Sequence, residues 1–200
     1  MKSFLRNLAV VAALFLPMSS AFAYDIPESR IQEGLDRKLP LIRPVPGGGD
    51  ITLQPGATIR LHGNGDITLE GNFRLVVPLS KTVLSGSLKA VTDIVYENSA
   101  IYLRRIAIDE ESFRVSAETK NRKTWLGKVV QQRADKAVLD FLNNPGKARD
   151  IVTTLLLKQL ESRPVYRLDG SRSWHAIVTP FITDENLKVE EGRLVIGILP

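Results

Sequence analysis

The chain has 200 residues, and its 27 lysine and arginine residues outnumber its 22 aspartate and glutamate residues, giving a formal net charge of +5. This surplus is too small to predict binding to nucleic acid, which requires a dense basic surface. The chain contains no cysteine, so disulfide bonds are excluded and an apolar core must hold the fold together.

The first 23 residues have the composition of a secretory signal peptide. Lys2 and Arg6 precede an apolar run from Leu8 to Leu16, and Ala21-Phe22-Ala23 matches a cleavage site. The alternative is a membrane anchor, but an apolar run of about nine residues is far shorter than the roughly 20 that cross a bilayer. We therefore expect a signal peptide over residues 1–23, cleaved after Ala23, and a single α+β domain over residues 24–200.

The predicted location follows from this signal peptide and from the missing cysteine. A chain without cysteine cannot carry the lipid that lipoproteins attach to a cysteine at the mature N-terminus. No transmembrane segment is predicted after the signal peptide, although peripheral contact with a membrane stays open. We therefore predict a free periplasmic protein of a Gram-negative bacterium.

The first predicted elements are short. Residues 24–26 are expected to form an edge strand. A helix follows, because Ile31, Leu35 and Leu39 form one apolar stripe, and Pro40 is expected to end it.

The segment from residue 41 to the first long strand is predicted to contain a loop and two short strands. Leu41–Gly49 is expected to be a loop, because it holds two prolines and three consecutive glycines. Ile51–Leu53 and Ala57–Leu61 are predicted strands separated by a Pro-Gly turn. Asn64-Gly65 is a strong hairpin signal that leads into the first long strand.

The segment Asp66–Ala117 is predicted to form three unusually long strands, around which the rest of the chain is organised. Its apolar residues alternate with polar ones, which is typical of half-buried strands. The inward set is Ile67, Leu69, Gly71, Phe73, Leu75 and Val77 in the first strand and Leu84, Gly86, Leu88, Ala90, Ile94 and Tyr96 in the second. Strands of about twelve to fifteen residues exceed the usual five or six and must coil, which creates a concave face that other segments fill.

A β-bulge is predicted in the third long strand. Glu97-Asn98-Ser99 is the expected turn, and Ile101 begins the strand. The alternation slips by one residue at Arg104-Arg105 before it resumes at Ile106. One extra residue that reverses the parity is what a bulge inserts, and bulges bend and twist a strand.

The chain after Ala117 is predicted to be mainly helical. Apolar residues recur at three- and four-residue spacing over Lys123–Leu142, and we expect this helix to fill the concave face of the sheet. Contact with a membrane surface is the alternative role. Asn143–Gly146 breaks the pattern, and Pro145 is expected to begin a second helix whose inward residues are Ile151, Val152, Leu155, Leu156 and Leu160.

Short elements are predicted at the C-terminal end. Pro164–Leu168 is expected to be a short strand, and Ser171–Val178 a helix capped by Ser171. Leu187–Val189 and Arg193–Ile198 then form the two arms of a hairpin around Glu190-Glu191-Gly192.

Several of these segments resemble one bacterial family. The run Pro164-Val165-Tyr166-Arg167-Leu168-Asp169-Gly170, the start of the first long strand at Leu69–Asn72 and the closing hairpin with its Gly192–Ile196 arm are similar to the YceB-like putative lipoproteins, a domain of unknown function. The resemblance implies a curved antiparallel sheet wrapped around a long helix, similar to the lipid-binding modules of the bactericidal/permeability-increasing protein class.

The chain departs from this family in two respects. It lacks the lipidated cysteine, and the break at Asn143–Gly146 leaves open whether the helical part is one helix or two. The expected fold is therefore an α+β fold in which a long curved antiparallel sheet wraps around one or two long helices. The resemblance implies no catalytic residues.

We predict an apolar groove between the sheet and the helices that binds a lipid, an acyl chain or another apolar molecule. The long strands and two apolar helices supply more apolar surface than a compact α+β domain needs, while a fully packed core is the open alternative. The candidate groove residues are Phe73, Leu75, Leu88, Ile94, Leu103, Val130, Phe141 and Leu156.

A basic surface near the groove is a candidate for holding an anionic headgroup. Its residues are Arg104, Arg105, Lys81, Lys89 and Lys128. The alternative is scattered surface charge, which contributes little to binding or stability.

Catalysis, metal binding and cofactors are not predicted. His62 and His175 have no carboxylate or nucleophilic serine beside them in the sequence, so they match neither a catalytic triad nor a metal site. Asp109-Glu110-Glu111 and Glu190-Glu191 lack the alternating ligands of a calcium loop.

Three functions follow from these patterns. The first is a periplasmic, non-catalytic carrier or sensor of a hydrophobic molecule. The second is a cell-envelope interaction or scaffold protein with a fully packed core, which uses a sheet edge or a basic face to contact another protein. The third is a hydrolase, which a buried and paired histidine would support.

Overall fold

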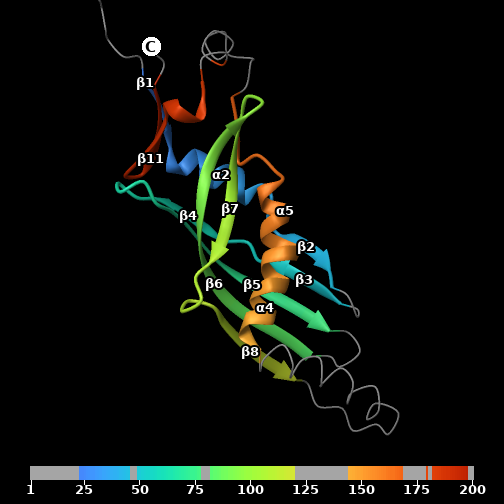
Figure 1. Cartoon of the computed structure of the whole chain (residues 1–200). Helices are drawn as coiled ribbons and strands as arrows, with labels where there is room; N and C mark the ends of the chain where they lie inside the picture. The colour runs from blue at the N-terminus through green and yellow to red at the C-terminus, as the bar shows by residue number, and fades with distance from the viewer. Residues whose placement is uncertain are drawn as a thin grey trace, which may run out of the picture.

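The computed structural model describes residues 23–45, 49–77, 82–119, 144–168, 179 and 182–197, which form two antiparallel sheets and several helices (Figure 1). The strands are β1 (Ala23–Pro27), β2 (Leu41–Pro44), β3 (Asp50–Leu53), β4 (Thr58–Leu61), β5 (Ile67–Val77), β6 (Thr82–Glu97), β7 (Ala100–Ile108), β8 (Arg114–Thr119), β9 (Tyr166–Arg167), β10 (Leu187–Glu190) and β11 (Arg193–Gly197). The helical elements are α2 (Glu28–Asp36), α4 (Pro145–Val152), the π-helical turn η1 (Thr153–Leu157), α5 (Lys158–Glu161) and the 3-10 turn η3 (Asp184–Asn186).

The larger sheet is strongly curled and is built around the pair β5 and β6. Its order is β2-β3-β5-β6-β7-β9, with β4 beside β5 and β8 beside β6. β5 has 11 residues and β6 has 16, and they pair from Ile67 opposite Thr92 to Val77 opposite Thr82. The first two predicted long strands and the antiparallel curved sheet are therefore confirmed, and Figure 1 shows helices α4 and α5 lying across one face of this sheet.

The third predicted long strand is divided into two. β7 and β8 both pair with β6, but Asp109–Phe113 leave the sheet between them. The hydroxyl of Ser112 takes the place of a strand there, since it accepts a hydrogen bond from the Lys89 backbone N–H at 3.1 Å and donates one to the Asp109 carbonyl at 2.9 Å. Acidic residues fit a pleated sheet poorly, which explains why Asp109-Glu110-Glu111 forms a turn.

The predicted bulge is confirmed in β7. Val91 of β6 lies opposite Ala107 and Asp93 lies opposite Arg104, so both Arg105 and Ile106 face the single residue Thr92. Arg105 has a φ of 52°, the left-handed conformation that the first residue of a glycine-type bulge adopts.

The helix that begins at Pro145 is confirmed, and it continues through η1 and α5 to Glu161. The Asn144 side chain caps it by accepting a hydrogen bond from the Lys147 backbone N–H at 3.1 Å. The predicted inward residues Val152, Leu156 and Leu160 are buried, whereas Ile151 and Leu155 are partly buried against the same core. The predicted helices over 123–142 and 171–178 lie outside the described residues, as does the predicted signal peptide apart from Ala23.

The smaller sheet joins the two ends of the described chain in the order β1-β11-β10. Tyr24 lies opposite Ile196, and Leu187 lies opposite the same residue from the other side. Among the described strands, β1 pairs with β11 alone and β10 pairs with β11, so the predicted N-terminal edge strand and the predicted C-terminal hairpin are both confirmed.

Two predictions near the N-terminus are wrong. Leu41–Pro44 is the edge strand β2 and not part of a loop, because an edge strand tolerates a proline whose missing N–H would face away from the sheet. Helix α2 ends at Asp36 and does not reach Leu39. A proline disfavours the α conformation of the residue before it, so Pro40 opposes a helical Leu39 and the helix ends before that residue.

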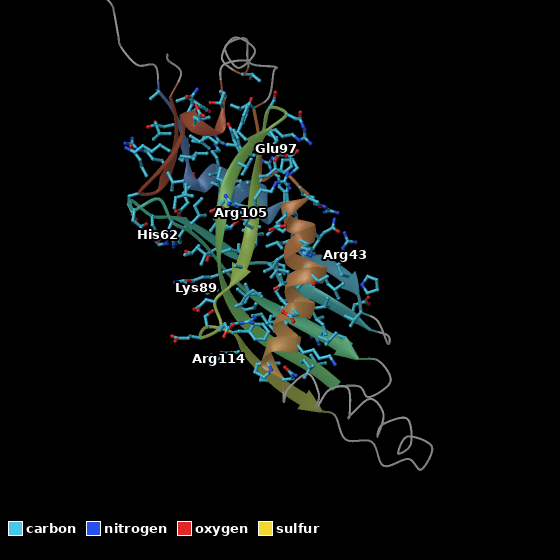
Figure 2. The ribbon with its side chains drawn as sticks, viewed as in Figure 1. Arg43, His62, Lys89, Glu97, Arg105 and Arg114 are labelled. Carbon is cyan, nitrogen blue, oxygen red and sulfur yellow. The ribbon has the colours of Figure 1, made fainter. Side chains whose placement is uncertain are left out.

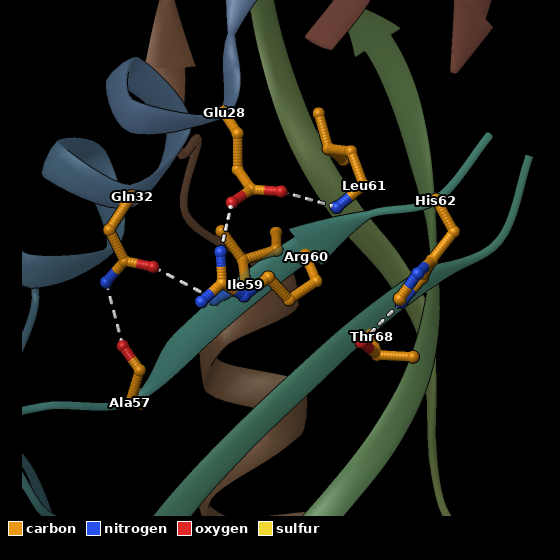
Figure 3. A network of polar contacts seen from close by, with 8 residues as sticks. All are labelled: Glu28, Gln32, Ala57, Ile59, Arg60, Leu61, His62 and Thr68. Atoms are coloured by element: carbon orange, nitrogen blue, oxygen red, sulfur yellow. Dashed lines mark hydrogen bonds and ion pairs between the residues drawn. The ribbon is translucent and has the colours of Figure 1, made fainter. Parts of the chain in front are cut away.

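Helix α2 packs between the two sheets and covers the free edge of β4 (Figure 3). Ile31 and Leu35 are fully buried on its inner face. The Gln32 amide donates to the Ala57 carbonyl at 2.8 Å and accepts from the Ile59 backbone N–H at 2.9 Å, so it replaces a neighbouring strand.

The Glu28 carboxylate also binds to the free edge of β4, at Arg60 and Leu61. It accepts a hydrogen bond from the Leu61 backbone N–H at 2.8 Å and pairs with the Arg60 guanidinium at 3.0 Å. Within the part of the chain that the structure describes, no helix is both long and apolar enough to span a membrane.

We expect Gln32→Ala to lower the free energy of unfolding by about 1–3 kcal/mol, because the backbone groups of Ala57 and Ile59 would lose their partners in a partly buried place. Urea denaturation followed by circular dichroism measures this change. The control is Gln159→Ala on helix α5, where no side-chain hydrogen bond is formed within the described residues. A loss no larger in Gln32→Ala than in this control would contradict the edge-cover role.

Helix α2 approaches the segment before β9 so closely that only glycine fits at position 34. A Cβ on Gly34 would lie 1.5 Å from the Val165 carbonyl oxygen, which is backbone and has little room to move. We expect Gly34→Ala to lower the free energy of unfolding by about 1–3 kcal/mol or more, although an unstrained change of this kind in a helix raises it by up to about 1 kcal/mol.

Gly146→Ala in α4 is the matched control, because the nearest atom to its added Cβ, Asn144 Oδ1, lies at an ordinary 3.6 Å. Thermal and urea denaturation of both variants provide the measurement. Equal stability of the two variants would mean that α2 shifts freely against the Val165 segment.

Candidate functional site

The predicted groove residues that the structure describes belong to one apolar layer between the curled sheet and the helix. Five of them are buried, with exposed fractions of 5% or less, and Ile94 is partly buried against the same layer. These six residues are Phe73, Leu75, Leu88, Ile94, Leu103 and Leu156. Val130 and Phe141 lie outside the described residues. The structure therefore brings the described candidates together in a continuous core.

Close backbone contacts and one ion pair join the helical segment to the sheet. The backbone of η1 lies close to β2, β3 and β7, and α5 lies close to β7. An ion pair between Arg149 of α4 and Glu110 of the β7–β8 turn joins this part of the helix to the sheet.

Two stacked aromatic rings lie in this layer. The rings of Phe73 and Phe113 are parallel to within 8°, with centroids 5.4 Å apart. Phe73 lies opposite Gly86, where an added Cβ would come within 2.4 Å of the Phe73 ring, so the missing side chain makes room for the ring.

The core also contains buried residues that were not among the predicted groove candidates, and Phe113, Ala148 and Leu157 are three of them. Phe113 lies two residues after the acidic run Asp109-Glu110-Glu111, and an apolar aromatic residue at the end of a polar turn indicates that the chain returns to the core. Leu157 is adjacent to Leu156 and both are fully buried, which the wider π-helical turn there accommodates.

Arg104, a predicted headgroup residue, joins the bulge to the end of the helix. Its guanidinium pairs with Glu97 at 2.5 Å, donates to the Glu161 carbonyl at 2.6 Å and lies 4.6 Å from the centre of the Tyr102 ring. The Glu161 carboxylate in turn accepts the backbone N–H of Ile106, which the bulge frees from the strand ladder, at 2.7 Å. Arg104 is therefore held in place by structural contacts.

The other predicted headgroup residues are spaced along the strands and do not gather into one site (Figure 2). Arg105 pairs with Asp93 at 2.5 Å, and its side chain is 80% exposed. Lys89 pairs with Glu70 at 3.2 Å. Lys81 and Lys128 lie outside the described residues.

The described histidine and the acidic turns make structural contacts with neighbouring segments. The His62 ring Nε2 lies 3.0 Å from the Thr68 hydroxyl (Figure 3). The Glu191 carboxylate accepts the Gly63 backbone N–H at 2.8 Å. Within the described ranges, no three histidine, aspartate or glutamate side chains are grouped so that they could hold a metal ion. His175 lies outside these ranges, and the predicted lack of catalysis stays a prediction.

Comparison with known proteins yields little. No family model matches the chain, and no curated protein matches it. Among solved structures, it is similar to a protein described as "Crystal structure of lipopolysaccharide binding protein", with 12% sequence identity and a TM-score of 0.30. The match covers 88% of this chain and 49% of the other, so the chain spans about half the length of that protein. A TM-score this low supports neither a shared fold nor a shared function.

We expect Arg105→Gly to raise the free energy of unfolding by about 0.5–1 kcal/mol. A left-handed residue with a side chain costs about 1–2 kcal/mol, whereas the exposed pair with Asp93 contributes about 0–1 kcal/mol. The matched control is Arg74→Gly in the regular part of β5, which should lower the free energy by about 0.5–1 kcal/mol. Urea denaturation measures both, and a loss of stability in Arg105→Gly would mean that the arginine side chain is needed at the bulge.

Proposed function

We propose that this chain is an exported, non-catalytic protein that binds a hydrophobic molecule, such as a lipid or an acyl chain, between its curled sheet and the helix α4–α5. The observation that carries the proposal is the continuous apolar layer that spans the concave face and includes six predicted groove residues. Ligand sites of this kind are concave and mostly apolar.

The position of Phe113 supports entry of the ligand beside the β7–β8 turn. Phe113 lies on a turn outside the strand ladder, and a turn residue moves with less loss of hydrogen bonding than a strand residue. An acyl chain would take the place of such side chains and keep the layer apolar.

We also propose that the protein is periplasmic and that it is a divergent relative of the YceB-like family. The location rests on the signal-peptide pattern of residues 1–23. The family rests on the short motifs, whose described parts lie in β5, β9, β10 and β11.

The second candidate is an interaction protein of the cell envelope, and one observation favours it. Ile42 on the edge strand β2 is 54% exposed, and the outer edge of β2 has no neighbouring strand within the described residues. An exposed apolar side chain on an open edge suits the addition of a strand from a partner. The shortness of β2 and its proline limit this role.

Protein purified without detergent distinguishes the two candidates. Native mass spectrometry followed by organic extraction should detect a bound lipid, and the delipidated protein should take up a fluorescent fatty acid. An empty protein that takes up no fatty acid would overturn the first candidate and leave the interaction role.

A variant at the edge of the layer provides the sharper test. We expect Ile94→Gln to weaken uptake of the fluorescent fatty acid about tenfold, a change of about 1.4 kcal/mol, because the amide would replace apolar contact with the ligand. Ile94 is already partly exposed, so the fold should tolerate the change.

The control is Leu187→Gln, which alters an apolar residue of similar burial in the smaller sheet. It should leave the uptake of fatty acid unchanged. Equal uptake by both variants and the unaltered protein would place the ligand elsewhere.

A further inference from the structure

A cavity of about 770 Å³ lies between helix α2 and the segment that contains β9. None of the predicted groove residues lines it. Its charged lining consists of Arg30, Glu33, Arg37, Lys38 and Arg167, that is, four cations and one carboxylate. The cavity therefore differs from the apolar layer both in its residues and in its chemistry.

The close approach at Gly34 creates this concentration of charge. Helix α2 contributes Arg30, and Arg37 and Lys38 follow its last residue, whereas Arg167 comes from β9. The Val165 carbonyl lies against the Gly34 backbone, where no side chain would fit, and this contact brings the two basic segments together.

Most of the positive charge in the cavity is not neutralised. Glu33 is shared between Arg30 at 3.1 Å and Arg37 at 3.7 Å. Lys38 and Arg167 form no ion pair with a carboxylate within the described residues. The helix dipole favours cations at the C-terminal end of α2, but it does not account for a cation from β9.

The surroundings of Lys38 oppose its charge. Burial lowers the pKa of the Lys38 ammonium below its ordinary value. The second cause is repulsion from three guanidinium groups, those of Arg163, Arg167 and Arg37. A bound anion would relieve both effects, because it would supply the missing opposite charge.

Further polar groups line the remaining wall. The Tyr24 and Tyr166 hydroxyl groups lie 3.3 Å apart and both line the cavity. Asn98 and Ser99 line it from the β6–β7 turn, and both residues have positive φ angles. Hydroxyl and amide groups beside arginines are the donors that phosphate oxygens accept from.

We propose that this cavity is a binding site for a phosphate-bearing ligand, with Lys38, Arg37 and Arg167 as the principal contacts. A phosphate group carries up to two negative charges and matches the planar fork of an arginine, which a single carboxylate satisfies less fully. The phosphate belongs either to a soluble molecule or to the headgroup of a lipid. This site does not depend on the apolar layer, so either proposal stands if the other fails.

Calorimetric titration of the full-length mature protein with inorganic phosphate tests the site. The chloride concentration is adjusted to hold the ionic strength constant, because salt screens non-specific attraction. We expect saturable binding and a thermal midpoint that rises with phosphate concentration. An absence of both effects, together with no binding to the vesicles described below, would overturn the proposal.

The test variant is the double substitution Lys38→Gln and Arg167→Gln. It should weaken phosphate binding at least tenfold, while its thermal midpoint without phosphate equals or exceeds that of the unaltered protein, because the repulsion is removed. The single substitution Lys38→Gln should give an intermediate affinity, which keeps the test decisive if the double variant folds poorly.

The control Lys147→Gln removes an exposed cation of α4 and should bind phosphate normally. Equal losses in the control and the test variant would overturn the site.

Flotation with vesicles distinguishes the two sources of phosphate. Vesicles of phosphatidylcholine alone are compared with vesicles made from equal parts of phosphatidylcholine and phosphatidylglycerol. Binding to the mixed vesicles that inorganic phosphate displaces, and that the double variant loses, supports a lipid headgroup. Phosphate binding without vesicle binding supports a soluble ligand. Vesicle binding that the double variant retains, with no phosphate binding, would overturn the cavity as the site.

Discussion

The structure depends on the burial of the concave face of β5 and β6. These strands are long enough to coil. On its outer side, β5 pairs with two short strands, β3 and β4, and β6 pairs with two others, β7 and β8, and a turn separates the two strands of each pair. The interruptions release backbone pairing at intervals, so the sheet can curl without a break in its central pair. The helix α4–α5 then fills the curve, and its apolar residues form one layer with those of the sheet.

Helix α2 imposes a second constraint on the other end of the molecule. It supplies side chains that complete the edge of β4, and its Gly34 meets the backbone at Val165. Helix α2 therefore contacts two separate parts of the larger sheet, the edge strand β4 and the segment before β9. The same close approach brings cations from two distant segments to one cavity, whose charged lining is mainly basic.

The two candidate sites differ in whether their cations have carboxylate partners. Along the long strands, Arg104, Arg105 and Lys89 each have their own carboxylate partner, so little charge is left for a ligand. Beside α2, one carboxylate serves two arginines and the remaining cations have no partner in the described chain. Unpaired positive charge in a cavity favours the binding of an anion, whereas exposed ion pairs contribute little to binding or stability. The apolar layer and the basic cavity would thus bind ligands of different chemistry.

The sequence by itself determined the elements whose signals are local. Alternating residues revealed β5 and β6, the slip at Arg104-Arg105 revealed the bulge, and Pro145 marked the start of α4, because strand parity and helix capping act between near neighbours. Tertiary structure alone decided that Leu41–Pro44 forms an edge strand, since its partner β3 provides the hydrogen bonds that the prolines and glycines obscured.

Tertiary structure likewise decided the basic cavity. Lys38 and Arg167 are far apart in the sequence, and no pattern in either segment predicts that they line one space. Their meeting depends on the packing of Gly34 against Val165, a contact between distant parts of the backbone. The groove residues were predictable because burial follows from alternation within each strand. The charges of the cavity were not, because electrostatic interactions depend on distances that only the folded chain sets.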